Sequence, residues 1–170
     1  MKVGDYCKRG VIAVGAKADI TEAAKLMRDD HIGFLVVCNE DDEIRKPVGV
    51  LTDRDIVLQV TARDVNPHAV TVADVMTRKP LIATETDDVG DLLQAMRIAG
   101  IRRVPVVDTR GALTGIIALD DVIDVVTGML CDISGSIKHE QRQEWRSRRC
   151  YGDSADAAGF SHPRPASNAS

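Results

Sequence analysis

The fold is decided by the segment Asp19-Ile20-Thr21-Glu22-Ala23-Ala24-Lys25-Leu26-Met27-Arg28, which recurs as Asp88-Val89-Gly90-Asp91-Leu92-Leu93-Gln94-Ala95-Met96-Arg97. The likeness continues from Leu35-Val36-Val37 onto Val104-Pro105-Val106, and from Val48-Gly49-Val50-Leu51 onto Thr114-Gly115-Ile116-Ile117. Each copy runs for roughly 55 to 60 residues, longer than a typical solenoid repeat, and there are only two copies. The pattern indicates the duplication of one small domain.

The apolar spacing predicts the same order of elements in each copy. A short strand (11–14 or 81–84) precedes a helix capped by Asp19 or Asp88, whose apolar residues recur at helical spacing. A continuous apolar strand follows (34–38 or 104–107), then a polar turn (41–42 or 108–111), a second strand (48–51 or 113–117) and a closing helix (54–61 or 120–128). Each copy is therefore an α+β unit of order β-α-β-β-α. We expect the two copies to pack sheet to sheet with pseudo-two-fold symmetry and a cleft on each side.

The junction Gly49-Val50-Leu51-Thr52-Asp53-Arg54-Asp55 has two interpretations. In the structural one, a buried strand breaks into a helix that Thr52 or Asp53 caps. In the functional one, the helix start offers N–H donors to a phosphate, and a carboxylate a few residues on accepts two hydrogen bonds from a ribose diol. The residues alone leave both open.

Composition limits the classes of function. Aromatic residues make up only 3% of the chain and the net charge is −4, which disfavours a base-stacking nucleic-acid platform and gives no general attraction to anionic membranes. The sequence has no apolar run of membrane-spanning length and no signal-peptide core at its start, so a cytoplasmic location is expected. Nothing pairs a nucleophile with a base, and we expect no enzymatic activity.

The four cysteines, Cys7, Cys38, Cys131 and Cys150, are far apart in the sequence and form no C-x-x-C motif. A zinc site is therefore not expected. Cys38 continues an apolar strand and is predicted to be buried and reduced. Cys7 and Cys150 are predicted to be exposed, which leaves a redox-linked regulator as a minor alternative.

The repeat, the segment Asp74-Val75-Met76-Thr77 that opens the second copy, and the closing Gly-apolar-apolar-Thr-x-x-Asp pattern resemble a pair of cystathionine-β-synthase (CBS) domains, also called a Bateman module. The resemblance covers residues 3 to about 131 and places the repeats at 3–63 and 70–131. It implies a stand-alone regulatory module, usually a homodimer, that signals to an effector protein. It also implies an adenosyl ligand such as AMP, ADP, ATP, NAD or S-adenosylmethionine in the clefts between the repeats. The alternative is a ligand-free scaffold for dimerisation or partner docking.

The resemblance also implies which residues contact such a ligand. Thr52, Arg54 and Asp55 match the motif in the first copy, whereas the second copy keeps Asp121 but has Ala118 in place of the hydroxyl, so its cleft is expected to be the weaker. Loss of one hydrogen bond weakens binding by about 1 kcal/mol. Arg102 and Arg103 are either phosphate contacts or a solvated strand edge, and His31 is interpreted as a helix-end surface residue. The apolar adenine slot, or plain core, is assigned to Ile12, Val50, Leu81 and Ile116.

The chain beyond the repeats departs from the family pattern. Residues 134–150 are predicted to be a basic, helical extension: between Lys138 and Arg149 there are five Lys/Arg against two acids, and Trp145 lies among them. The extension either packs on the module or its dimer partner, contacts an acidic partner or nucleic acid, or is a solvated face. Residues 151–170, rich in Ala and Ser with two prolines, are predicted to be a disordered tail.

Overall fold

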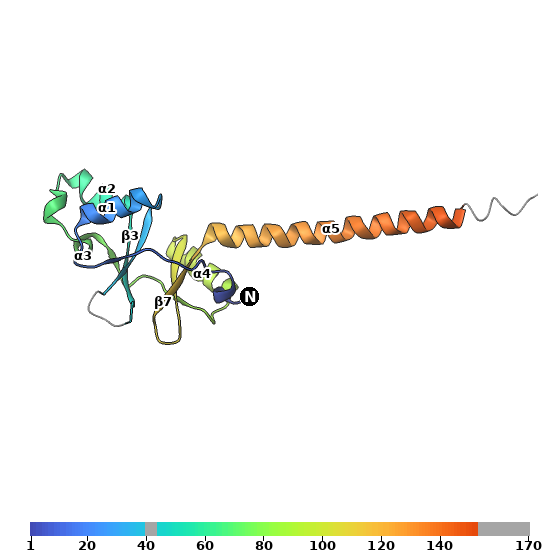
Figure 1. The fold of residues 1–170 in the computed structure, drawn as a ribbon, viewed down its shortest axis with the longest axis horizontal. Helices are drawn as coiled ribbons and strands as arrows, with labels where there is room; N and C mark the ends of the chain where they lie inside the picture. The colour runs from blue at the N-terminus through green and yellow to red at the C-terminus, as the bar shows by residue number, and fades with distance from the viewer. Residues whose placement is uncertain (40–43, 153–170) are drawn as a thin grey trace, which may run out of the picture. The chain divides into compact units, whose positions relative to one another are not determined.

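The structure, a computed structural model, describes residues 1–39 and 44–152, excluding the side chains of 146–152. The chain divides into two units at residue 124, and the first contains all but the end of the second repeat. Figure 1 shows the order of the elements. The helices and short 3-10 turns are η1 (Val3–Asp5), α1 (Ile20–Asp29), α2 (Asp53–Gln59), η2 (Thr61–Arg63), η3 (Pro67–Ala69), α3 (Val72–Val75), α4 (Val89–Ala99) and α5 (Leu119–Gly152). The strands are β1 (Ala13–Gly15), β2 (Phe34–Cys38), β3 (Pro47–Thr52), β4 (Thr77–Arg78), β5 (Ala83–Thr84), β6 (Arg103–Val107) and β7 (Leu113–Ala118).

The two repeats build two separate sheets with the same topology. In the first sheet, of order β1-β2-β3-β4, the central strand β2 runs parallel to β1 and antiparallel to β3. In the second, of order β5-β6-β7, β6 runs parallel to β5 and antiparallel to β7. The predicted α+β fold of two β-α-β-β-α repeats is confirmed. The predicted turn at 41–42 lies outside the described residues.

The helices α1 and α4 begin where the sequence places their caps. The Asp19 carboxylate accepts a hydrogen bond from the Thr21 backbone N–H at 2.6 Å, and Asp88 accepts one from the Gly90 N–H at 2.7 Å. Each helix then buries one apolar face, because its large apolar residues recur every three or four positions. The buried residues are Ile20, Ala23 and Met27 in α1, and Val89, Leu92 and Met96 in α4.

The opening segment of each repeat packs on the other repeat, which the sequence analysis did not anticipate. Val3 is buried in the second core and its N–H donates to the Asp87 carbonyl at 2.9 Å. Val72 is buried in the first core and its N–H donates to the Ala18 carbonyl at 2.9 Å. The short strand β4 likewise joins the first sheet by pairing with β3. This exchange ties the two repeats together and follows their pseudo-two-fold symmetry.

Two equivalent glycines permit these crossings. A Cβ at Gly49 would lie 2.5 Å from the Met76 sulfur, and a Cβ at Gly115 would lie 2.8 Å from the Cys7 sulfur. Carbon atoms cannot approach a sulfur so closely. The glycines of the two repeat motifs therefore serve the close packing of the exchanged segments.

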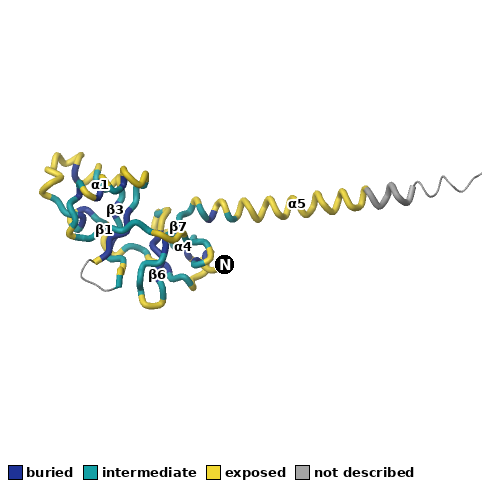
Figure 2. The backbone as a smooth tube through the Cα atoms, viewed as in Figure 1, coloured by how far each residue is buried: buried dark blue, intermediate teal, exposed yellow. Residues whose placement is uncertain are grey.

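Each repeat has its own aliphatic core. One cluster centres on Leu35, Leu51 and Ile20, the other on Val104, Ile117 and Met96, and all six are at most 2% exposed. In Figure 2 the buried segments follow the strands of both sheets and the inner faces of α1 and α4. Fully burying one such side chain contributes about 1.5–3 kcal/mol to the hydrophobic stabilisation.

Helix α5 differs from its prediction. The closing helix of the second repeat is predicted to end near Gly128, whereas α5 continues without a break to Gly152. The predicted extension at 134–150 is thus part of this helix. Of the predicted disordered tail at 151–170, all but the first two residues lie outside the described residues.

Carboxylates that accept hydrogen bonds from nearby threonines make the stability of the fold depend on pH in the acid range. The Thr71 hydroxyl holds the pKa of Asp74 below its ordinary value, the Thr21 backbone N–H does so for Asp19, and the Thr84 hydroxyl for Asp87. Because these folded-state pKa values lie below those of the unfolded chain, their stabilisation is present above about pH 4 and is lost as the pH falls through the folded values. We expect the thermal midpoint to be constant from neutral pH to about pH 5 and to fall steeply below about pH 4. A midpoint unchanged at pH 3 would contradict this account.

Candidate ligand-binding clefts

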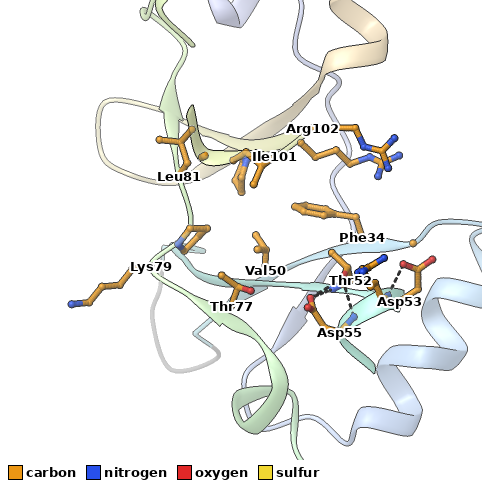
Figure 3. A pocket seen from close by; sticks show the side chains of 17 residues that line it. Phe34, Val50, Thr52, Asp53, Asp55, Thr77, Lys79, Leu81, Ile101 and Arg102 are labelled. Atoms are coloured by element: carbon orange, nitrogen blue, oxygen red, sulfur yellow. Dashed lines mark hydrogen bonds between the residues drawn. The ribbon is translucent and has the colours of Figure 1, made fainter. Parts of the chain in front are cut away.

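The first cleft lies between the repeats and has a volume of about 540 Å³. That size falls within the range of small-molecule sites, roughly 300–1,000 Å³. The junction between β3 and α2 forms one wall, while the start of the second repeat and the segment between α4 and β6 form the other (Figure 3). Its principal lining residues are Phe34, Val50, Thr52, Asp53, Arg54, Asp55, Thr77, Lys79, Leu81, Ile101, Arg102 and Arg103.

Thr52 and Asp55 form a reciprocal cap at the start of α2. The Thr52 backbone N–H donates to Asp55 Oδ2 at 2.9 Å, and the Thr52 hydroxyl donates to the same oxygen at 2.7 Å. In return the Asp55 N–H donates to Thr52 Oγ1 at 3.1 Å. The structural interpretation of this junction is therefore confirmed, and it also lines the cleft. Both bonds end on Oδ2, and within the described residues none ends on Oδ1, so that oxygen remains an acceptor for a ligand.

The rest of the cleft combines an apolar wall with cations. Figure 3 shows Leu81 and Ile101 on one side facing Val50 on the other, with Phe34 between Thr52 and Arg102. The cationic groups that line the cleft are Arg54, Lys79, Arg102 and Arg103, against the carboxylates Asp53 and Asp55. An apolar slot flanked by guanidinium groups suits a flat base that carries phosphate, because guanidinium binds phosphate in a bidentate manner.

The second cleft occupies the pseudo-symmetric position and has a volume of about 430 Å³. Ile12 and Ile116 take the places of Leu81 and Val50, and Ala118 takes the place of Thr52. Asp121 lines this cleft without a hydroxyl partner at the capping position. Its lining residues are Lys8, Arg9, Gly10, Val11, Ile12, His31, Ile32, Gly33, Phe34, Arg103, Ile116, Ala118, Asp120 and Asp121.

The Asp121 carboxylate of the second cleft forms an ion pair with a lysine of the same chain. Lys8 Nζ lies 2.5 Å from Asp121 Oδ1. The hydrogen bond to Asp121, and then the negative charge of the same carboxylate, raise the pKa of Lys8. The neighbouring Arg9 is paired with Glu85. One oxygen of the carboxylate equivalent to Asp55 is thus already paired with a cation from the same chain.

All ten predicted contact residues line one of the two clefts. Val50, Thr52, Arg54, Asp55, Leu81 and Arg102 line the first, Ile12, Ile116 and Asp121 the second, and Arg103 lines both. Sequence reasoning missed Lys8, Thr77, Lys79 and Ile101, and it placed His31 on the surface alone. His31 is exposed at the end of α1, with a φ of 54°, and also lines the second cleft. The repeat alignment contains a signal for Lys8 and Thr77, which occupy equivalent positions just before Ile12 and Leu81.

The thiols differ partly from their predictions. Cys38 is buried, as expected, but Cys7 is partly buried against Gly115 rather than exposed. Burial raises the pKa of the Cys7 thiol, which lowers its thiolate fraction. The side chain of Cys150 lies outside those described. Among the described residues, no group of three His, Cys, Asp or Glu side chains is placed to hold a metal ion.

The duplicated sheets, the exchanged opening segments and the two inter-repeat clefts define a module of two paired repeats with a cleft at each of two pseudo-symmetric positions. The chain matches the CBS domain family over residues 3–62 and 72–128, and it belongs to that family. An uncharacterized protein of Methanopyrus kandleri is 35% identical over 144 residues, which cover 84% of this chain and 71% of that protein.

Two similar solved structures contain adenosyl compounds. A CBS domain protein of Pyrobaculum aerophilum, complexed with AMP, is 26% identical, with a TM-score of 0.65 over 71% of this chain and 89% of that one. A CBS domain pair in complex with 5′-methylthioadenosine and S-adenosyl-L-methionine is 28% identical, with a TM-score of 0.65 over 76% of this chain and 98% of that one. In the described part of the present chain, no helix is both long and apolar enough to cross a membrane.

Proposed function

We propose that the protein is a regulatory module that binds an adenine nucleotide or related adenosyl ligand in the first cleft. The observation that carries the proposal is the convergence of Asp55 Oδ1, the apolar wall of Val50 and Leu81, and the guanidinium of Arg102 in one cleft. Asp55 accepts from the ribose diol, the apolar wall holds the base, and Arg102 pairs with phosphate or carboxylate. The adenosyl complexes of the two similar structures support this assignment.

The geometry refines the role of Thr52. Its hydroxyl hydrogen is directed to Asp55, so its first task is to fix the carboxylate in place. Fixing this group before binding lowers the ordering cost that the ligand must overcome. The charge of a phosphate is then met mainly by Arg54, Arg102 and Arg103, which reach the cleft from both repeats.

In this proposal, ligand binding is signalled by a change in the arrangement of the two repeats. A ligand that contacts Asp55 in the first repeat and Arg102 in the second favours the arrangement in which both contacts form. We propose that a homodimer transmits this change to an effector protein. Val57 and Leu58 on α2, 54% and 45% exposed, offer apolar surface for such contacts.

The experiment is a thermal-shift series with AMP, ADP, ATP, NAD and S-adenosylmethionine on the wild type and on Asp55→Ala. A ligand that binds only the folded state stabilises it by about 2.7 kcal/mol at a hundredfold excess over Kd. We expect at least one ligand to raise the midpoint of the wild type but not that of Asp55→Ala.

The matched control is Asp74→Ala. Asp74 makes the same reciprocal cap with Thr71, at 2.9 and 2.6 Å, but lies outside both clefts. The Asp74→Ala variant therefore loses an equivalent helix cap, and its thermal midpoint should still rise fully on ligand addition. If no ligand shifts the wild type at millimolar concentration, the proposal fails and the ligand-free scaffold is favoured.

The two clefts are expected to differ in occupancy. Because Lys8 competes with a ligand for Asp121, adenosine should bind the wild type detectably only in the first cleft. In Lys8→Ala the carboxylate is released, and we expect calorimetric titration with adenosine to show a second, weaker event. Lys25→Ala, which lines neither cleft, serves as the control. An unchanged stoichiometry in Lys8→Ala would contradict the blocking role of Lys8.

A further inference from the structure

Helix α5 carries a stripe of large aliphatic side chains that the second unit leaves uncovered. The stripe consists of Val126, Leu130, Ile133 and Ile137, which are 45%, 61%, 59% and 52% exposed. Their spacing of four, three and four residues places them on one face of the helix. Figure 2 shows this part of α5 exposed along its length.

The sequence around the stripe has a low intrinsic helix propensity. Gly128 and Gly135 lie in its interior, and Ser134 and Ser136 flank the second of them. Glycine is the poorest helix former after proline, and helices without tertiary contacts are marginal in water. A continuous helix through this segment is therefore best explained by burial of the stripe against a partner.

Charge identifies the partner. From residue 119 to 137 the helix contains the acids Asp120, Asp121, Asp124 and Asp132 and no Lys or Arg, whereas residues 138–149 contain five Lys/Arg against two acids. The helix thus has an acidic first part, which contains the stripe, and a basic second part, which begins directly after the stripe. Such a helix is complementary to a reversed copy of itself and repels a parallel copy.

We propose that α5 pairs antiparallel with α5 of a second copy of this chain through the stripe. The stripe is self-complementary in this arrangement: Val126 lies opposite Ile137 of the other copy, and Leu130 lies opposite its Ile133. The same register brings Asp124 close to Lys138 of the other copy. The pairing does not depend on a nucleotide.

Cysteine cross-linking in the full chain tests the pairing and its direction. In a Cys131→Ser, Cys150→Ser background, one sample carries Val126→Cys and another Ile137→Cys. After mixing, subunit exchange and mild oxidation, we expect a disulfide-linked dimer that contains one chain of each kind. Neither variant alone should cross-link, because the two equivalent residues would lie about 16 Å apart along the axis, whereas a disulfide needs Cα atoms within about 7 Å.

The matched control is the pair Gly128→Cys and Gly135→Cys. These positions have the same register but lie on the opposite face, and a Cβ at either one has nothing within 4 Å. We expect this mixture to give no more cross-linked dimer than the cysteine-reduced background. Self-linking of Ile137→Cys would show a parallel pair and overturn the proposal. Absence of a link in the Val126→Cys and Ile137→Cys mixture would overturn it too, since the stripe would then be uncovered or packed on its own chain.

Discussion

Replacing Ile117 with alanine lowers the free energy of unfolding by about 2–5 kcal/mol. Ile117 is 0% exposed on β7 and packs in the second core beside Val104 and Met96. The substitution removes buried apolar surface and leaves a cavity that the close-packed neighbours fill only partly. Urea denaturation, followed by far-ultraviolet circular dichroism, measures the loss.

The control for this prediction is Ile98→Ala. Ile98 lies on α4 and is 78% exposed, so the same chemical change there should alter stability by no more than about 0.5 kcal/mol. Equal effects at the two positions would mean that β7 does not pack as described.

Replacing Arg102 with alanine weakens the binding of phosphate-bearing ligands about tenfold to a hundredfold. Charge-assisted hydrogen bonds are worth roughly 1.5–3 kcal/mol, and every 1.4 kcal/mol is a factor of ten in affinity. Because Arg102 lies beside Phe34 at the end of the cleft away from Leu81, adenosine should lose much less affinity than AMP or ATP (Figure 3). Calorimetric titration of each ligand gives the comparison, which rests on the proposed function.

Arg97 provides the control for this effect. It is exposed in the last turn of α4 and lines neither cleft, so Arg97→Ala changes the net charge equally without removing a cleft contact. If the two variants bound AMP equally well, Arg102 would be the solvated strand edge of the alternative interpretation.

The fold was largely predictable because its determinants are local and occur twice. Asp19 and Asp88 mark the helix starts, and the apolar runs from 34 to 38 and from 104 to 107 mark the central strands. The duplication also predicts that the two repeats pack against each other, because neither repeat covers its sheet alone. The contact residues of the first cleft were found for a similar reason: the junction from Val50 to Asp55 is a contiguous motif.

What the sequence analysis missed depends on contacts between distant segments. Lys8 reaches Asp121 only because the opening segment of the first repeat pairs with β7 of the second. No local sequence pattern predicts that pairing between distant segments. The same exchange partly buries Cys7, which was predicted to be exposed. The continuation of α5 was missed because Gly128 is typical of a helix end, whereas the helix passes through it.

The central claim is tested most directly by a crystal structure of the full chain grown with saturating AMP. The account predicts ligand density in the first cleft, with the base between Val50 and Leu81 and the ribose hydroxyls on Asp55 Oδ1. It also predicts that the Lys8 to Asp121 pair remains intact in the second cleft. Density in the second cleft alone, or none in either cleft at a concentration that saturates binding in solution, would contradict it.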